Sequence, residues 1–430
     1  MKYFSLKNRT HTTNFENAVL KGLAPDKGLY FPSAIKKLPF SFFEELEKLS
    51  KTEIAFEAIR NYIGEEIPRY ALIKIIKNTV DFDFPLAEIE PGISSLELFH
   101  GPTLAFKDVG ARFMAGCLGY FVEKGNIDKV TVLVATSGDT GGAVANGFLG
   151  VPGIEVVILY PKGKVSNIQE KQLTTLGKNV TALEVEGAFD ECQEMVKKAF
   201  LDEEITHKKM LTSANSINVA RWLPQMFYYF FAYRKLMSHK KLVFSVPSGN
   251  FGNICAGLLA KEMGLPVTHF VASNNRNNVV TRYLKTQTYQ PEKSIATISN
   301  AMDVGDPSNF VRVLELFQKK FDSLKNCVSS YSFSDEETRR AIKEVYEKSG
   351  YIMDPHGAVG YLGLRCFLKE QPGFYGSFLE TAHPVKFLET VEEVINEKIN
   401  IPSSISELLD KEKKSISIKT YEDLKNYLLQ

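Results

Sequence analysis

The spacing of apolar and polar positions changes near residue 96. Ahead of it, residues 41–49, 52–63 and 69–80 place apolar side chains at helical intervals, and Pro68 stands where a proline suits a first helical turn. Residues 22–32 are rich in turn-forming residues, and residues 81–91 contain two prolines. We therefore expect a mostly helical N-terminal domain over residues 1–92.

Two strand–loop–helix–strand units follow. In the first, a β-branched strand at 130–135 precedes a polar glycine loop at 136–142, a helix from 143 and a strand at 155–159. The second has a strand at 242–246, a loop at 247–253, a helix at 254–263 and a strand at 267–272. Both loops read S-G-[DN]-x-G, and parallel sheets bind ligands at the carboxyl ends of their strands. The pattern predicts an α/β protein with two parallel-sheet lobes.

We place the smaller lobe at residues 93–235 and the larger one at 236–430. The segment after Pro402 is rich in Lys, Glu and Ser, which predicts a solvated surface and a terminal helix. The aromatic run at 226–233 is more typical of a core or a subunit interface than of a stacking surface.

Composition excludes several classes of protein. Lys and Arg number 52 against 51 Asp and Glu, a net charge of +1 that argues against nucleic-acid or anionic-membrane partners. No apolar run reaches the roughly 18 residues of a membrane span, and the first residues turn polar too early for a leader peptide. The five cysteines are scattered and no H-E-x-x-H string occurs, so we expect a cytoplasmic protein without a metal site.

The loop 248–253 has the form of an anion site, because a glycine loop leading into a helix exposes backbone N–H groups. The nucleotide string G-x-x-x-x-G-K-[ST] and the dinucleotide string G-x-G-x-x-G are both absent. We therefore expect a single phosphate there; an ordinary strand-to-helix turn is the alternative.

Lys107 follows an apolar Leu-Ala-Phe run and precedes a predicted helix. Desolvation favours a neutral amine, and a neutral amine can form a Schiff base. The alternative is a surface lysine paired with Asp108.

The segment 211–221 gathers short polar side chains and Arg221 at a helix start, a set that suits an anionic small molecule. A helix cap with a surface arginine is the alternative. His356 and His383 stand in turns near prolines, where a lone histidine is more often structural.

An amine nucleophile, a phosphate loop and a polar substrate loop together match the needs of a pyridoxal-phosphate enzyme. The chain resembles the threonine synthase family of the tryptophan-synthase-β-like, fold type II pyridoxal-phosphate enzymes. The resemblance runs nearly end to end through GLAPDKGLYFP, ELFHGPTLAFKD, TSGDTGGAV, NSIN-x-x-R, SVPSGNFG, SNAMDV and TAHPVKF.

The resemblance implies a role for each matching residue. Lys107 would hold the cofactor covalently and move protons, and Thr381 would bond the pyridine nitrogen. Asp139, with Ser137 and Thr140, would lie at the cofactor hydroxyl and the substrate carboxylate. The cofactor phosphate would be bound by Gly249, Asn250, Phe251, Gly252 and Asn253. The substrate phosphate would be bound by Asn215, Ser216, Asn218 and Arg221, with Lys162 a weaker candidate.

The implied activity is that of a carbon–oxygen lyase in threonine biosynthesis, which converts O-phospho-L-homoserine and water to L-threonine and phosphate. A fold type II threonine or serine dehydratase is the nearest alternative, and a non-catalytic relative of the fold is a second. The expected partner is the small-molecule substrate, and the expected state is a monomer or homodimer.

Overall fold

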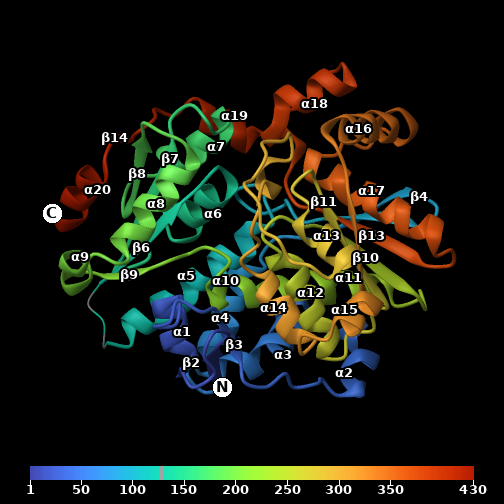
Figure 1. The fold of residues 1–430 in the computed structure, drawn as a ribbon, viewed down its shortest axis with the longest axis horizontal. Helices are drawn as coiled ribbons and strands as arrows, with labels where there is room; N and C mark the ends of the chain where they lie inside the picture. Colours follow the sequence, from blue (N-terminus) through green and yellow to red (C-terminus); the bar gives the residue numbers. More distant parts are fainter. Residues whose placement is uncertain (126, 128) are drawn as a thin grey trace.

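The computed structural model describes residues 1–125, 127 and 129–430. Three sheets organise this part of the chain: a three-stranded sheet of order β2-β1-β3, a five-stranded sheet of order β14-β8-β7-β6-β9, and a six-stranded sheet of order β12-β11-β10-β13-β5-β4. Figure 1 shows the N-terminal elements at one end of the molecule and the two larger sheets side by side above them. The predicted α/β class with parallel-sheet lobes is confirmed.

The N-terminal part combines helices with a small antiparallel sheet. Helix α3 begins after Ser50, whose hydroxyl accepts from the Glu53 N–H while the Glu53 carboxylate accepts from the Ser50 N–H, a capping box. The predicted helices at 52–63 and 69–80 are confirmed, whereas the one expected at 41–49 is broken at Glu45. The elements are β1 (Lys2–Ser5), β2 (Thr12–Asn14), α1 (Phe15–Lys21), β3 (Tyr30–Pro32), α2 (Phe40–Glu44), η1 (Leu46–Lys48), α3 (Lys51–Ile63) and α4 (Arg69–Thr79).

The five-stranded sheet is parallel throughout. Its interior strand β6, between β7 and β9, has all six side chains buried, as a β-branched strand covered on both faces requires, and it matches the predicted strand 130–135 residue for residue. Its strands are β6 (Val130–Ala135), β7 (Ile154–Pro161), β8 (Val180–Val185), β9 (Met210–Thr212) and β14 (Ile416–Ile418). The helices around it are α5 (Lys107–Glu123), α6 (Asp139–Gly147), α7 (Asn167–Thr174), α8 (Phe189–Ala199), α9 (Glu203–Lys208), α19 (Ser403–Leu409) and α20 (Tyr421–Leu429).

The six-stranded sheet is parallel except for β4, which pairs antiparallel with β5. Helix α17 packs along β10, β11 and β13. The strands are β4 (Leu86–Glu90), β5 (Ile93–Glu97), β10 (Leu242–Pro247), β11 (His269–Asn274), β12 (Val328–Ser332) and β13 (Tyr375–Glu380). The other elements are α12 (Gly252–Glu262), α13 (Val279–Thr286), η3 (Asn300–Met302), α14 (Phe310–Leu316), α15 (Phe321–Cys327), α16 (Asp335–Ser349), α17 (Pro355–Glu370), η4 (Pro384–Phe387) and α18 (Leu388–Ile395).

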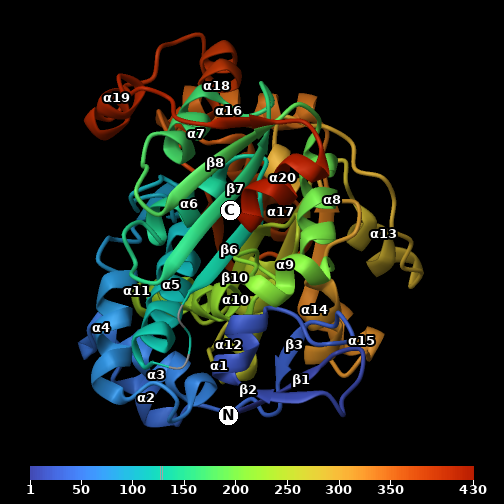
Figure 2. The same cartoon turned by 90° about the vertical axis from the view of Figure 1, so that its left-hand side faces the viewer.

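Strand pairing departs from the expected lobe boundaries at two places. Strand β5, expected in the smaller lobe, pairs with β13 of the six-stranded sheet. At the other end of the chain, β14 pairs with β8, and α20 packs on α8 and α9, so the C-terminal segment returns to the five-stranded sheet. Figure 2 shows this red segment crossing to the side of β7 and β8.

The aromatic run lies at the centre of the molecule. The run begins at the last residue of η2 (Leu223–Met226), which follows α10 (Val219–Trp222). Its remaining residues, 227–233, lie in α11 (Phe227–Leu236). Residues 226–233 are all buried, so the expectation of a core segment is confirmed. They belong to one apolar cluster that includes residues of the N-terminal part and of both larger sheets. Within the described residues, no helix is both long and apolar enough to cross a membrane.

Candidate active site

Lys107 is the first residue of α5, and the segment directly after β13 holds the chain just ahead of it. The Phe106 N–H donates to the Thr381 carbonyl at 2.9 Å, and Ala105 forms a bridge with Ala382. Thr381 directly follows β13 and is buried. Two segments far apart in sequence therefore bring Lys107 and Thr381 together.

The amine of Lys107 lies in surroundings that favour its neutral form. Burial lowers the pKa of Lys107, and the charges of Lys386 and Arg221 lower it further, against the opposing effect of Asp139. The alternative of a surface pair with Asp108 is not what the structure shows. Asp108 instead accepts from the Thr103 N–H at 2.9 Å and from its hydroxyl at 2.5 Å, and burial raises its pKa to about 6.

Asp139 opens α6, directly after the loop that follows β6. Its Oδ1 lies 2.7 Å from Nζ of Lys386 and accepts from Nε2 of Gln169 at 2.9 Å. Burial alone would raise the pKa of Asp139, but Lys386 and Lys107 hold it below its usual range. The Asp139 carboxylate therefore lies near enough to the amine of Lys107 to act on its charge, while its ion pair is with Lys386.

Ser137 lies in the loop that precedes Asp139, and Thr140 follows Asp139 in the first turn of α6. Both are half-buried, and neither hydroxyl has a hydrogen bond to any residue of the described chain. Gly138 between them has φ +149°, and a Cβ there would lie 2.6 Å from the Gln169 side chain. The two hydroxyls are therefore available to a ligand at the carboxyl end of β6.

The loop at the N-terminus of α12 has the geometry of an anion site. Phe251 adopts a left-handed conformation (φ 60°) and caps α12 without a side-chain hydrogen bond. Among the described residues, the backbone N–H groups of residues 249–254 have no acceptor. Nδ2 of Asn253 is buried and likewise without a partner in that part of the chain, while its Oδ1 accepts from the Tyr229 hydroxyl at 2.7 Å. A cluster of unpaired donors at a helix N-terminus fits a phosphate group.

Two glycines let the backbone of this loop pack closely on its neighbours. A Cβ on Gly249 would lie 2.7 Å from Cα of Met302, which belongs to the SNAMDV segment. A Cβ on Gly252 would lie 3.3 Å from Cβ of Ser216. The loop is thus pressed against the segment that carries Ser216.

Ser216 joins the two candidate anion-binding segments. Its hydroxyl accepts from Nδ2 of Asn250 at 2.9 Å and from Nδ2 of Asn309 at 3.1 Å. Asn215 contributes its carbonyl to the Asn218 N–H at 3.0 Å. The Asn218 side chain is fully buried and donates to the Val19 carbonyl at 2.8 Å, and it caps α10 by accepting from the Ala220 N–H.

Arg221 is buried and incompletely bonded. It donates to the Ala214 carbonyl, whereas its Nε has no acceptor within the described residues. Burial lowers the pKa of Arg221 to about 10, which leaves the group cationic at neutral pH. A buried guanidinium with an unused donor suits a phosphate ester.

Lys162 differs from the other predicted site residues. It directly follows β7, its side chain is 55% exposed, and its Nζ lies 3.9 Å from carboxylate oxygens of Glu184 and Glu186. The contacts that join the other residues do not include it.

Sequence reasoning missed two buried cations beside this site, Lys386 and Arg312. Arg312 is fully buried, and its guanidinium donates to carbonyls of Tyr30, Ser216 and Ile217 and to Oδ1 of Asn309. It also lies over the Trp222 ring, 4.4 Å from its centroid. Lys386 stands inside TAHPVKF, where a lysine among apolar neighbours could have indicated a buried cation. The sequence around Arg312 has no such signal.

The two histidines that stood near prolines have structural contacts. His356 Nδ1 lies 2.5 Å from Oδ1 of Asp354, and its Nε2 accepts from the Ala301 N–H at 3.2 Å. Glu380, directly before Thr381, accepts from the Asp354 N–H at 2.5 Å, and burial together with Asp354 raises its pKa well above the usual value. His383 bonds the Val385 N–H, and burial lowers its pKa to about 4.

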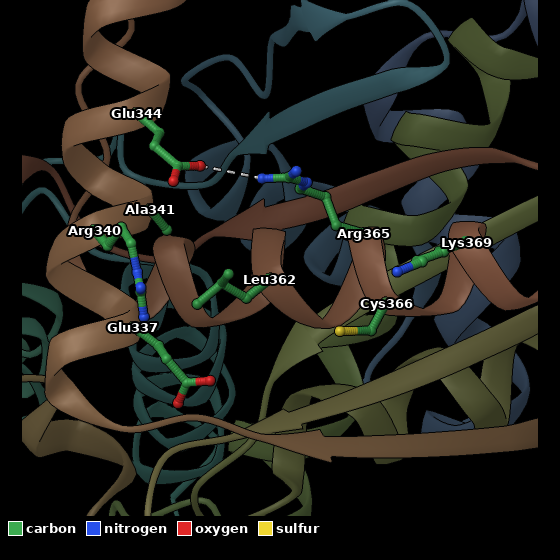
Figure 3. A pocket seen from close by; sticks show the side chains of 8 residues that line it. All are labelled: Glu337, Arg340, Ala341, Glu344, Leu362, Arg365, Cys366 and Lys369. Carbon is green, nitrogen blue, oxygen red and sulfur yellow. Dashed lines mark hydrogen bonds and ion pairs between the residues drawn. The ribbon is translucent and has the colours of Figure 1, made fainter.

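A cavity of about 410 Å³ lies elsewhere, between α16 and α17 (Figure 3). It is lined by the side chains of Glu337, Arg340, Ala341, Glu344, Leu362, Arg365, Cys366 and Lys369. None of the predicted site residues is among them. Within the described residues, no group of three or more His, Cys, Asp or Glu side chains could hold a metal ion.

Three family models match this chain. Residues 95–375 match the family described as pyridoxal-phosphate dependent enzyme. Residues 2–80 match the threonine synthase N terminus, and residues 357–428 match the threonine synthase C-terminal region. The fold and site thus define a pyridoxal-phosphate-dependent enzyme of fold type II.

Relatives and solved structures extend the match to the whole chain. The threonine synthase of Buchnera aphidicola subsp. Baizongia pistaciae is 45% identical and covers 100% of both chains. The crystal structure of threonine synthase from Escherichia coli superposes with a TM-score of 0.93 at 43% identity, covering 100% of this chain and 99% of that one. The pyridoxal-phosphate-bound threonine synthase of Brucella melitensis also gives 0.93, at 32% identity and with the same coverage. The chain belongs to the threonine synthase family.

Proposed function

We propose that this chain converts O-phospho-L-homoserine and water to L-threonine and phosphate, with Lys107 as its catalytic residue. The observation that carries this proposal is the hydrogen bond of Asn250 to Ser216, which sets two candidate anion-binding segments side by side. A cofactor phosphate and a substrate phosphate need two such segments. A dehydratase needs one, and membership of the threonine synthase family also favours the first activity.

The residues present fit pyridoxal phosphate. The unpaired N–H groups of residues 249–254 and Nδ2 of Asn253 would bind its phosphate, Lys107 would hold it covalently, and the Thr381 hydroxyl would face its ring nitrogen. When bound, the cofactor supplies an electron-poor ring that stabilises negative charge at substrate carbons.

The chain's own groups perform the proton and phosphate steps. The amine of Lys107, favoured in its neutral form by burial, accepts a proton at Nζ and returns it to the substrate. Arg221, with Ser216 and the loop that Asn218 holds in place, binds the phosphate dianion as it departs. Ser137 and Thr140 offer the substrate carboxylate two hydroxyls that have no partner among the described residues.

Product analysis of the purified protein with pyridoxal phosphate tests the proposal. O-phosphohomoserine should yield inorganic phosphate and threonine in equal amounts, and Lys107→Ala should yield neither. Ammonia released from threonine or serine, without phosphate from O-phosphohomoserine, would identify a dehydratase instead. No reaction with any of these substrates would leave the non-catalytic alternative.

A further inference from the structure

Lys386 is a fully buried lysine whose ammonium is completely bonded. Its Nζ lies 2.7 Å from Oδ1 of Asp139 and donates to the Thr103 carbonyl at 2.8 Å and to Oε1 of Gln172 at 2.9 Å. An ammonium has three donors, so each one has an acceptor. Such complete bonding fixes the position of the charge inside the protein.

This ammonium connects the parts of the molecule that form the site. Lys386 lies in η4, shortly after β13 and Thr381. Asp139 and Gln172 belong to α6 and α7 beside the five-stranded sheet, and Thr103 lies in the segment that leads to Lys107. The Asp139–Lys386 pair therefore bridges the two sheets next to the amine of Lys107.

We propose that Lys386 is a positioning residue that holds the Asp139 carboxylate in place and balances its charge, so that Asp139 does not fix Lys107 as a cation. The inference rests on the proposed function, in which Lys107 carries the cofactor. A lone buried carboxylate opposite an amine would form an ion pair with it and keep it protonated. A carboxylate already paired with a second lysine attracts that amine far less.

The charges around Lys107 act in opposite directions. Asp139 raises the pKa of Lys107, whereas Lys386 and Arg221 lower it. The other titratable groups that face Lys386 are Asp108, held by Thr103, and His383, on the turn that leads into η4. Removing Lys386 alone should therefore raise the pKa of Lys107, and removing Asp139 alone should lower it.

Cofactor uptake by the cofactor-free protein reports this pKa without any substrate. The neutral amine of Lys107 adds to the cofactor aldehyde and water leaves, so the uptake rate depends on pH through the unprotonated fraction. The rate is read from the visible absorbance of the protein-bound cofactor between pH 6 and 10. Because no turnover is measured, failure of the proposed reaction and failure of this inference are separate results.

We expect Lys386→Met to move the midpoint of uptake to higher pH by about one unit, within the range of nearby-charge effects. Asp139→Asn should move it to lower pH, and the double variant should return to within about half a unit of the native chain. Asp139→Asn keeps Lys386 and gives an independent result if Lys386→Met fails to fold. Lys413→Met is the matched control, because Lys413 pairs with Glu170 of α7 at 2.8 Å but has no contact with Asp139.

Three results would overturn the inference: unchanged midpoints in both single variants, shifts of both in the same direction, or a double variant as strongly shifted as Lys386→Met. A purely structural lysine would lower thermal stability without moving these midpoints. Thermal melting of each cofactor-free variant, measured beside the uptake rates, separates the two effects.

Discussion

Nδ2 of Asn250 donates to Oγ of Ser216 at 2.9 Å, and this bond ties the loop at the N-terminus of α12 to the loop that leads to Arg221. Asn309 donates to the same hydroxyl at 3.1 Å. The Ser216 hydroxyl therefore accepts hydrogen bonds from two side-chain amides, both of which lie on the same side of the molecule as the six-stranded sheet. A shift of either anion-binding segment would therefore displace the other through these hydrogen bonds.

Ser216→Ala should weaken the use of the phosphorylated substrate. The change leaves the amide donors of half-buried Asn250 and buried Asn309 without this acceptor, at a cost of about 1–3 kcal/mol, so kcat/KM for O-phosphohomoserine should fall about tenfold. Steady-state phosphate release measures it. Ser308→Ala is the control, because Ser308 contacts Asn250 through its backbone N–H rather than its exposed hydroxyl. Equal kinetics of the two variants would contradict the role of Ser216.

Arg221→Met should separate substrate binding from cofactor binding. The variant removes a buried guanidinium with an unused Nε donor but leaves the loop 249–253 untouched. We expect kcat/KM to fall by about 10–100-fold while bound cofactor, counted by absorbance, stays at one per chain.

Arg234→Met is the matched control for Arg221. This variant loses a partly buried hydrogen bond from Arg234 to the Leu49 carbonyl, 2.8 Å long and away from the site. If Arg221→Met lost the cofactor while Arg234→Met kept it, the assignment of Arg221 to the substrate phosphate would be wrong.

Arg312→Met should destabilise the fold more than most single changes. Its guanidinium bonds carbonyls of both the N-terminal part and the substrate loop, so its loss leaves several buried acceptors unpaired. We expect a loss of about 3 kcal/mol in urea unfolding of the cofactor-free chain. Arg9→Met, which removes an exposed pair with Glu315 on the same α14, should cost about 0–1 kcal/mol. Comparable losses of stability in the two variants would contradict this stabilising role of Arg312.

Glu380→Gln should change how stability depends on pH. Because the folded-state pKa of Glu380 is raised, its contribution is fully present below the unfolded pKa and is lost as pH rises through the folded pKa. Glutamine is neutral at every pH. The free energy of unfolding of the variant, relative to that of the native chain, should therefore rise between pH 5 and 8, by at most about 1.4 kcal/mol per pH unit. Urea midpoints at both pH values measure this gain; parallel pH profiles would show that Glu380 is ionised in the folded protein.

Local sequence signals predicted the elements whose structure is locally determined. The strand at β6 follows from six consecutive residues that all favour burial in a parallel sheet, and α3 follows from the helical spacing of apolar residues over 52–63. The break at Glu45 has no glycine or proline to announce it; it accompanies burial of Phe42, Phe43 and Leu46. The pairing of β14 with β8 was hidden by the polar composition of the C-terminal segment.

The residues of the site likewise fall into those that local sequence predicts and those that it does not. Lys107, Arg221 and the loop 248–253 stand in strings whose chemistry can be read from neighbouring residues. Lys386 and Arg312 act through partners distant in sequence, and Arg312 bonds Tyr30 across 282 positions. The fold alone brings such groups together, so the apolar neighbours of Lys386 could mark it as buried but could not identify its partners, and nothing local marked Arg312.

The most direct test of the account is one conversion of O-phosphohomoserine in oxygen-18 water by the pyridoxal-phosphate-loaded protein. A carbon–oxygen lyase adds solvent oxygen to carbon, so mass spectrometry should find one oxygen-18 in each threonine hydroxyl and none in the released phosphate, with no product from Lys107→Ala. Oxygen-18 in the phosphate would show cleavage of the phosphorus–oxygen bond, and turnover by Lys107→Ala would show that the amine is not required. Either result would contradict the proposed function.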